Sequence, residues 1–298
     1  MAKYKILVHG GAGEISAERL RYTSAEYIKK GVSLALEAGS SVLEGGGSAL
    51  DGVLAAVCEL EDFPAFNAGK GAVLTKNSNF VLSASIMDGS DLRVGAVAGL
   101  KTIKNPVTAA QSLLDHRHSF LYGEGPEELE LYKSSERVAE DYFLTEWRKK
   151  DLENLILSEK KDLTGTVGAV ALDQFGNLAA ATSTGGVVGQ FDSRVSDTPQ
   201  TGSGNWADQY CAVSGTGTGD EFIRVAFARR VADLMELANK SIEEAGAIAL
   251  KQLEFAGGNG GAIVVKSDGQ HAFPYNSKSL IAGVAEKESG ITPIIFGL

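Results

Sequence analysis

The stretch TGTVGAVALDQFGNLAAATSTGG, residues 164–186, is the most informative part of this chain for its architecture. Two runs of small, apolar, β-prone residues flank the turn DQFGN at 173–177, which predicts a hairpin of two buried strands. The preceding segment, 123–162, is dense in Glu, Lys and Asp; we expect it to be helix-capable at its start and mobile over 150–162. Thr166 therefore stands at the first position of a buried strand, directly after a charged segment.

Around this hairpin, hydrophobic periodicity predicts further helices and short strands. Helices are expected over 24–38, 48–60, 106–118, 221–238 and 241–255. Strands are expected over 4–9, 72–75, 80–86, 93–100, 209–215, 261–266, 270–274 and 292–297, the first of them ending in a glycine loop at 10–13. The helix over 48–60 is apolar on nearly every side and should be buried. This order of elements predicts an α/β (α+β) protein whose sheets pack together with helices outside.

Composition excludes several classes of protein. Hydrophobic residues make up 44% of the 298 residues, too many for a disordered chain, and no G-X-Y period organises the 36 glycines. The net charge of −10 argues against binding to nucleic acid or to an anionic membrane. Cys58 and Cys211 form neither a disulfide framework nor a zinc spacing. With no signal-peptide pattern and no apolar run of about 18 residues, we expect a cytoplasmic protein.

Standard phosphate, metal and triad motifs are absent from the sequence. Gly69-Lys70-Gly71 does not complete a Walker A motif, and the GTGTG run at 215–219 lacks the spacing of a dinucleotide fingerprint. Its backbone N–H groups could still form an anion-binding nest. The four histidines form no HExxH, and no GxSxG elbow occurs. Threonine is left as the candidate nucleophile.

Thr166 has a chemical interpretation and an ordinary one. If the Gly165–Thr166 bond is cut, Thr166 gains an α-amino group with a pKa near ~7.7 that can act as base for its own hydroxyl. Gly165 tolerates the strained geometry that such a cleavage needs. A threonine at the start of a strand is otherwise simply a good β-former, and the residues alone leave both interpretations open.

Seven motifs, in one order, extend the argument to most of the chain. They are VHGGAG at 8–13, LEDFPAFNAGKGAV at 60–73, SASIMDG at 83–89, GTVGAVALD at 165–173, ATSTGG at 181–186, SRVSDTP at 193–199 and SGTGTGDEFIR at 214–224. Together they resemble the plant-type L-asparaginase / isoaspartyl peptidase family of N-terminal nucleophile hydrolases. The resemblance runs from residue 5 nearly to the C-terminus and is weakest over 120–162.

The resemblance implies a fold and a maturation step. The fold is a four-layer αββα sandwich in a single domain, 1–298. The chain would be an inactive precursor that cleaves itself between Gly165 and Thr166. The pieces 1–165, with a flexible linker over about 150–165, and 166–298 would stay associated, and two such pairs would form a homodimer.

The resemblance also assigns catalytic roles to individual residues. Thr166 is the nucleophile, and the Thr184 hydroxyl touches it. Thr216 and the backbone N–H of Gly217 form an oxyanion hole. Asn67 is an active-site asparagine near the nucleophile.

Substrate binding is implied in the same way. Arg194 grips the substrate α-carboxylate, while Asp197 and the Gly219 carbonyl bind its α-ammonium. The substrates would be L-asparagine and β-aspartyl dipeptides, hydrolysed without a catalytic cofactor through an acyl-enzyme. A structural sodium ion would be held by main-chain carbonyls. The carbonyls belong to Leu60, Glu61, Phe63, Phe66, Ala68 and Lys70.

Some positions depart from the usual family pattern. Ser193 and Ser196 stand where glycines are common, and VVGQFD at 187–192 replaces a polar run containing Asn-Lys. Ser83 stands where an acidic residue is frequent, and Arg93 where a small one is common. These departures bear on substrate preference and rate.

Three related interpretations compete with this one. A glycosylasparaginase-like amidase usually has Asp-Thr-Ile at the cut and disulfides, and a taspase-like protease needs a longer loop. A poorly processed, non-catalytic relative would be marked by loss of Thr166, Arg194 or Thr216, and all three are present.

Overall fold

The predicted hairpin lies at the centre of a large sheet. The structure, a computed structural model, describes residues 4–15, 17–158 and 165–298. Within them an eight-stranded sheet runs in the spatial order β12 (Gly290–Phe296), β11 (Ser279–Glu286), β1 (Lys5–Gly13), β5 (Val167–Leu172), β6 (Leu178–Thr184), β2 (Leu82–Asp88), β3 (Val94–Leu100) and β4 (Phe120–Tyr122). A four-stranded sheet has the order β10 (His271–Ala272), β9 (Gly260–Lys266), β8 (Cys211–Gly217) and β7 (Asn205–Ala207).

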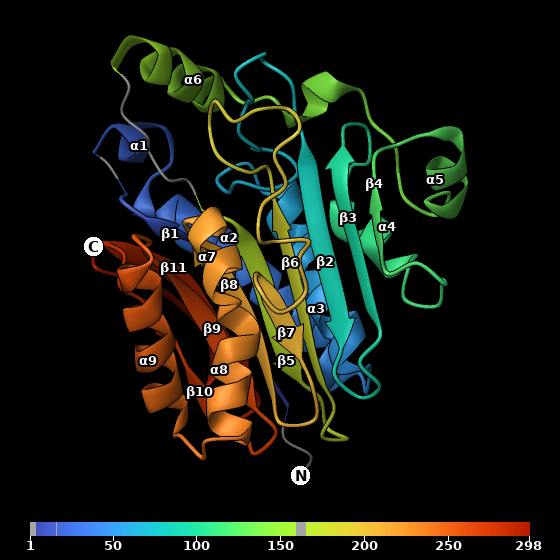
Figure 1. Ribbon diagram of the computed structural model, residues 1–298, viewed down its shortest axis with the longest axis vertical. Helices are drawn as coiled ribbons and strands as arrows, with labels where there is room; N and C mark the ends of the chain where they lie inside the picture. Colours follow the sequence, from blue (N-terminus) through green and yellow to red (C-terminus); the bar gives the residue numbers. More distant parts are fainter. Residues whose placement is uncertain (1–3, 16, 159–164) are drawn as a thin grey trace.

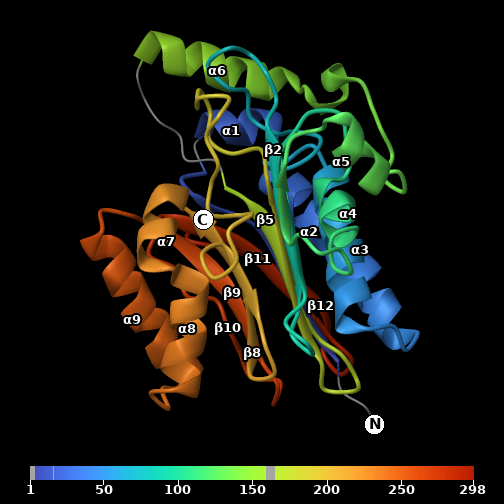
Figure 2. The same cartoon turned by 45° about the vertical axis from the view of Figure 1, so that its right-hand side comes forward.

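Helices cover the outer face of each sheet (Figures 1 and 2). The helices before β5 are α1 (Ala17–Tyr22), α2 (Ala25–Glu44), α3 (Ala49–Asp62), α4 (Pro106–Gln111), α5 (Pro126–Leu131), a short 3-10 helix (Glu140–Phe143) and α6 (Glu146–Ser158). Those after β8 are α7 (Gly219–Val225), α8 (Phe227–Glu236) and α9 (Ile242–Phe255). None of the helices in the described ranges is both long and apolar enough to cross a membrane.

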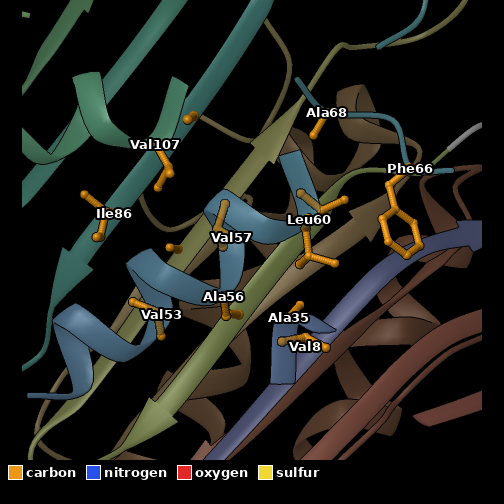
Figure 3. Close-up of a cluster of buried hydrophobic side chains, with 14 of the residues drawn as sticks. Val8, Ala35, Val53, Ala56, Val57, Leu60, Phe66, Ala68, Ile86 and Val107 are labelled. Atoms are coloured by element: carbon orange, nitrogen blue, oxygen red, sulfur yellow. The ribbon is translucent and has the colours of Figure 1, made fainter. Parts of the chain in front are cut away.

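Three buried clusters hold the layers together. Between the sheets, Leu7 and Val170 pack with Ile263 and Val265. A second cluster joins the small sheet to α8 and α9. The third joins α2 and α3 to the outer face of the large sheet, and its α3 members line up in Figure 3, including Val53. The predicted αββα sandwich is confirmed, whereas the predicted 48–60 helix buries one face only and exposes Asp51 and Glu59, because it lies in an outer layer.

Two serines set the starts of α2 and α3. Ser24 accepts a hydrogen bond from the Tyr27 N–H, and Ser48 from the Asp51 N–H. Ser241 and Glu244 form a complete capping box at α9. Each cap satisfies backbone N–H groups that have no partner within the helix.

The strands of the structure differ from the predicted strands at three places. The strand β11, Ser279–Glu286, was missed; it fills the place between β1 and β12. The strand β1 continues through the glycine loop to Gly13, because that segment pairs with β11 after an irregularity at His9/Gly11. Residues 72–75 are not a strand.

Two helix predictions also need correction. The helix from Pro106 ends at Gln111 rather than at 118. The predicted 221–238 helix is two helices, because Ala226 adopts a left-handed conformation with φ 47°. Residues 150–158 are the end of α6, so this part of the charged segment is helical; its predicted mobility stays a prediction, and residues 159–164 lie outside the described residues.

Candidate active site

Two threonines meet at the open end of the central hairpin. β5 and β6 pair with Val167 opposite Ser183, so Thr166 and Thr184 are the next neighbours across the strands. The Thr166 Oγ donates to the Thr184 Oγ at 3.2 Å, and the Gly186 N–H donates to the same Thr184 oxygen at 3.0 Å. Thr166 is only 8% exposed. The register thus brings together the two hydroxyls that the resemblance assigns to the nucleophile and its partner.

The predicted oxyanion residues lie at the end of β8, in the other sheet. The Thr216 hydroxyl accepts a hydrogen bond from the Ala12 N–H at 3.1 Å, which joins β8 to the glycine segment of β1. In the same segment a side chain at Gly11 would come within 2.9 Å of the Gly165 Cα. Thr216 and Gly165 therefore lie against one short stretch of β1, and Gly11, with φ +118°, has to be glycine for the backbones to approach.

A buried histidine holds the backbone of the candidate nucleophile. His9 Nδ1 lies 3.0 Å from the Thr166 carbonyl oxygen, and its Nε2 lies 2.8 Å from the Ser214 Oγ, which lies 2.8 Å from the Thr182 Oγ. A carbonyl only accepts, so Nδ1 carries the proton. In the neutral ring Nε2 then accepts from Ser214, which in turn accepts from Thr182.

This histidine is neutral, and the motifs of the sequence predict no role for it. Burial lowers the pKa of His9 to about 3, outweighing the hydrogen bond to Thr166 that favours the charged ring. His9 pairs in register with Gly168, where a side chain would collide with the imidazole. A histidine at the end of the predicted first strand, directly before Gly10, is the signal that could have found it; the facing Gly168 lies two residues after Thr166.

The two predicted binding residues are arranged differently from a simple ion pair. Arg194 pairs with Asp220 (Nη2 to Oδ2, 3.0 Å) rather than with Asp197. Asp197 is fully buried, and its Oδ2 has no hydrogen-bond partner among the described residues. A side chain at Gly219 would collide with the Asp197 carboxylate and lie 3.3 Å from the Arg194 Nη2. A guanidinium, a carboxylate and a bare glycine therefore surround one point.

The ionisation of Asp197 favours the binding of a cation. Burial raises the pKa of Asp197 to about 7, although Arg194 lowers it and Asp220 raises it further. A buried carboxyl with a free oxygen becomes stably ionised when an ammonium group is placed beside it. Such a point can hold the head group of an amino acid.

Asn67 ties the loops around Thr184. Its side-chain N–H₂ donates to the Gly186 carbonyl at 2.7 Å, and its side-chain oxygen accepts from the Val73 N–H at 3.0 Å. The Gly185 N–H donates to the Asn67 carbonyl at 3.1 Å. Asn67 therefore positions the turn whose Gly186 N–H contacts Thr184.

The loop over 60–70 is closed on itself by main-chain contacts. The Lys70 N–H donates to the Glu61 carbonyl at 2.7 Å, and Gly69, with φ +47°, lies where a side chain would collide with that carbonyl. Carbonyl oxygens are the hard ligands that a sodium ion prefers, and the ion predicted at this loop stays a prediction. The Glu61 side chain accepts from the Ser183 Oγ at 2.6 Å, and burial raises its pKa to about 8.

The helix α6 closes over this loop at one end of the molecule (Figures 1 and 2). Trp147 Nε1 donates to the Pro64 carbonyl at 3.2 Å, and the fully buried Arg148 donates through Nε to the Gly71 carbonyl at 2.5 Å. Arg148 also stacks on the Trp147 ring at 3.5 Å and pairs with Asp151. Burial lowers the pKa of Arg148 to about 9 despite Asp151. The end of the charged segment is thus part of the site's frame.

A four-layer αββα sandwich with a threonine opening a central strand is the architecture of N-terminal nucleophile hydrolases. The family described as Asparaginase matches residues 2–294, and the chain belongs to this family. It is 40% identical over 296 residues to an isoaspartyl peptidase of Escherichia coli (strain K12), covering 94% of this chain and 92% of that protein. It is 41% identical over 285 residues to an isoaspartyl peptidase/L-asparaginase of Mus musculus (92% and 86%), and 39% identical over 302 residues to one of Bos taurus (98% and 96%).

Proposed function

We propose that this chain is a self-cleaving amidohydrolase that converts L-asparagine to L-aspartate and ammonia and cleaves β-aspartyl dipeptides. The observation that carries the proposal is the buried contact between the Thr166 and Thr184 hydroxyls at the start of β5. The printed names of its relatives, isoaspartyl peptidase and isoaspartyl peptidase/L-asparaginase, support the same substrates.

In the self-cleavage step, the Thr166 Oγ attacks the Gly165 carbonyl carbon. The Gly165–Thr166 C–N bond breaks, the nitrogen takes up a proton, and an ester remains on the Thr166 oxygen. Water hydrolyses this ester, which frees the Thr166 hydroxyl and leaves it beside a new α-amino group. The close approach of Gly165 to Gly11 is the geometry that supports cleavage here.

The two pieces would remain one domain because their strands alternate in the large sheet. Strands β12, β11, β5 and β6 belong to piece 166–298, whereas β1 lies between β11 and β5 and belongs to piece 1–165. Separating the pieces would break the backbone ladders on both edges of β1. A cut at Gly165 therefore leaves the sheet intact.

In turnover, the α-amino group of Thr166 takes the proton from its own hydroxyl as the oxygen attacks the β-carboxamide carbon of asparagine. Thr216 and the Gly217 N–H stabilise the oxygen that becomes negative. Ammonia, or the amino end of the second residue of a dipeptide, leaves with a proton, and water then releases aspartate from the ester. His9 and Thr184 hold the carbonyl and the hydroxyl of the nucleophile during both steps.

The substrate head group fits the point between Arg194, Asp197 and Gly219. The guanidinium would bind the α-carboxylate, and Asp197 with the Gly219 carbonyl would bind the α-ammonium. The ammonium removes the cost of ionising the buried Asp197.

Further parts of the proposal concern the surroundings of the site. The sodium ion would be held by the 60–70 loop and would stiffen the segment that carries Asn67. The functional unit would be a homodimer of cleaved pairs in the cytoplasm, acting on small molecules and binding neither nucleic acid nor membrane; the net charge of −10 supports the last two points.

A denaturing gel with intact-mass analysis and an ammonia-release assay tests the proposal. We expect two fragments of 165 and 133 residues and release of ammonia from L-asparagine. The Thr166→Ala variant should stay uncut and inactive. A wild-type chain that stays whole and inactive after long incubation would overturn the proposal in favour of a non-catalytic relative, and cleavage of the variant would show that the nucleophile is another residue.

A further inference from the structure

The guanidinium of Arg194 is held by two acceptors of different character. The Gln190 Oε1 accepts from Nη1 at 2.8 Å, and the Asp220 Oδ2 accepts from Nη2 at 3.0 Å and from Nε at 3.3 Å. Asp220 is 59% exposed, so water and salt weaken its contribution. Gln190 is only 7% exposed. The buried amide is therefore the fixed partner of Arg194.

Gln190 is itself held in place by the surrounding loop. Its side-chain oxygen also accepts from the Val187 N–H at 3.1 Å, and its carbonyl accepts from the Lys76 N–H at 3.0 Å. The neighbouring Gly186 has φ +86°, and a side chain there would overlap the Gln190 amide. The amide consequently has one position, and the position of Arg194 follows from it.

The direction given to Arg194 matters for what the site can bind. With Nη1 fixed by Gln190, Nη2 faces the point beside Gly219 and Asp197, 3.3 Å from where a Gly219 side chain would lie. A glutamine is a neutral acceptor, so it orients the guanidinium without cancelling its charge. A carboxylate at the same position would be a second anionic partner besides Asp220 and would weaken the attraction of Arg194 for a ligand carboxylate.

We propose that Gln190 is a specificity-determining positioning residue, which aims Arg194 so that the site selects ligands carrying an α-carboxylate. The inference rests on the proposed function for the class of ligand, an α-amino acid with a β-carbonyl group. Gln190 falls in VVGQFD, the run that departs from the usual family pattern, so the role belongs to this chain's own sequence.

Calorimetric binding of two ligands to the cleaved enzyme tests this role. The ligands are L-aspartate and β-alanine, which is aspartate without its α-carboxylate. The Gln190→Met variant keeps the length of the side chain and removes the acceptor. We expect the Kd for L-aspartate to rise roughly tenfold or more, as for loss of a hydrogen bond to a charged group, and the Kd for β-alanine to change less than about twofold.

Matched variants guard against a loop that fails to fold. Gln190→Asn stays polar but is one methylene too short to reach Nη1, and it should give the same selective loss. Gln209→Met makes the same chemical change at an exposed glutamine between β7 and β8 and should bind both ligands as wild type does. Thermal unfolding of each variant reports whether the fold is retained.

The outcomes separate the inference from the proposed function. Equal binding of L-aspartate by wild type and the Gln190 variants, or an equal loss for both ligands, overturns the role of Gln190. A wild type that binds no L-aspartate overturns it as well. If the Gln190 variants lose affinity for L-aspartate selectively but the wild type hydrolyses no asparagine, the inference is supported and the proposed function is overturned.

Discussion

Asp197→Asn should make the folded chain more stable at alkaline pH while removing its ability to bind substrate. Burial raises the pKa of Asp197 to about 7, whereas the ordinary value for the side chain is 3.8. The folded state therefore binds more protons than the unfolded state between these values, and the free energy of unfolding falls as the pH rises through that window. An asparagine cannot ionise and escapes this loss.

The magnitude follows from the difference between the two pKa values. A difference of about three pH units corresponds to roughly 4 kcal/mol at about 1.4 kcal/mol per unit. Asp197 is 3% exposed, so solvent screens this energy little. From pH 4 to pH 8, the free energy of unfolding of the variant relative to that of the parent should rise by roughly 4 kcal/mol, and most of this rise should occur above pH 4.5.

Urea unfolding in the Thr166→Ala background measures this gain on one uncut chain. The parent and the Asp197→Asn form are compared at pH 4, 6 and 8, and Asp220→Asn serves as the exposed control with a change below about 1 kcal/mol. A difference in stability that is the same at all three pH values, or an Asp197→Asn chain that is less stable at pH 8, would refute the reasoning.

Three further changes probe the frame of the site. Thr184→Val should slow self-cleavage and lower kcat by roughly 10–100-fold with the fold retained, because the hydroxyl that contacts Thr166 and accepts from the Gly186 N–H is lost while the size of the side chain is kept; an unchanged rate on a gel time course would contradict this. His9→Leu should lower kcat of the cleaved enzyme by at least about tenfold, and His9→Asn, which can still donate to the Thr166 carbonyl, should recover part of it; equal activities would count against the tautomer assigned here. Arg148→Met should lower the melting temperature measured by circular dichroism, since about 1–3 kcal/mol of stability is lost when the Gly71 carbonyl loses its donor. A variant that melts at the same temperature as wild type would contradict the role of α6.

Local patterns were enough to predict the elements that carry the two candidate catalytic threonines. The β-prone runs and the DQFGN turn fix the hairpin, and a hairpin centred on that turn sets Thr166 across from Thr184. Ser24 and Ser241 mark helix starts because capping depends on residues within one turn. Such features depend on neighbours in the sequence, so the sequence alone predicts them.

Elements and contacts that depend on distant partners were missed. The strand β11 is stabilised by β1, more than 260 residues away, and β1 runs through the glycine segment for the same reason. The helical ending of the charged segment depends on Trp147 and Arg148 reaching the carbonyls of Pro64 and Gly71. No periodicity in one segment reports a partner in another.

The same division holds at the site. The order of motifs along the chain indicates the family, and with it the proposed threonine nucleophile and the proposed carboxylate-binding arginine, because such motifs depend on residue type. The neutral state of His9, the raised pKa of Asp197 and the pairing of Arg194 with Gln190 and Asp220 instead arise from burial and from distance. Desolvation and hydrogen-bond geometry exist only once the two sheets are packed. The tertiary structure alone therefore sets the protonation states of His9 and Asp197 and the orientation of Arg194.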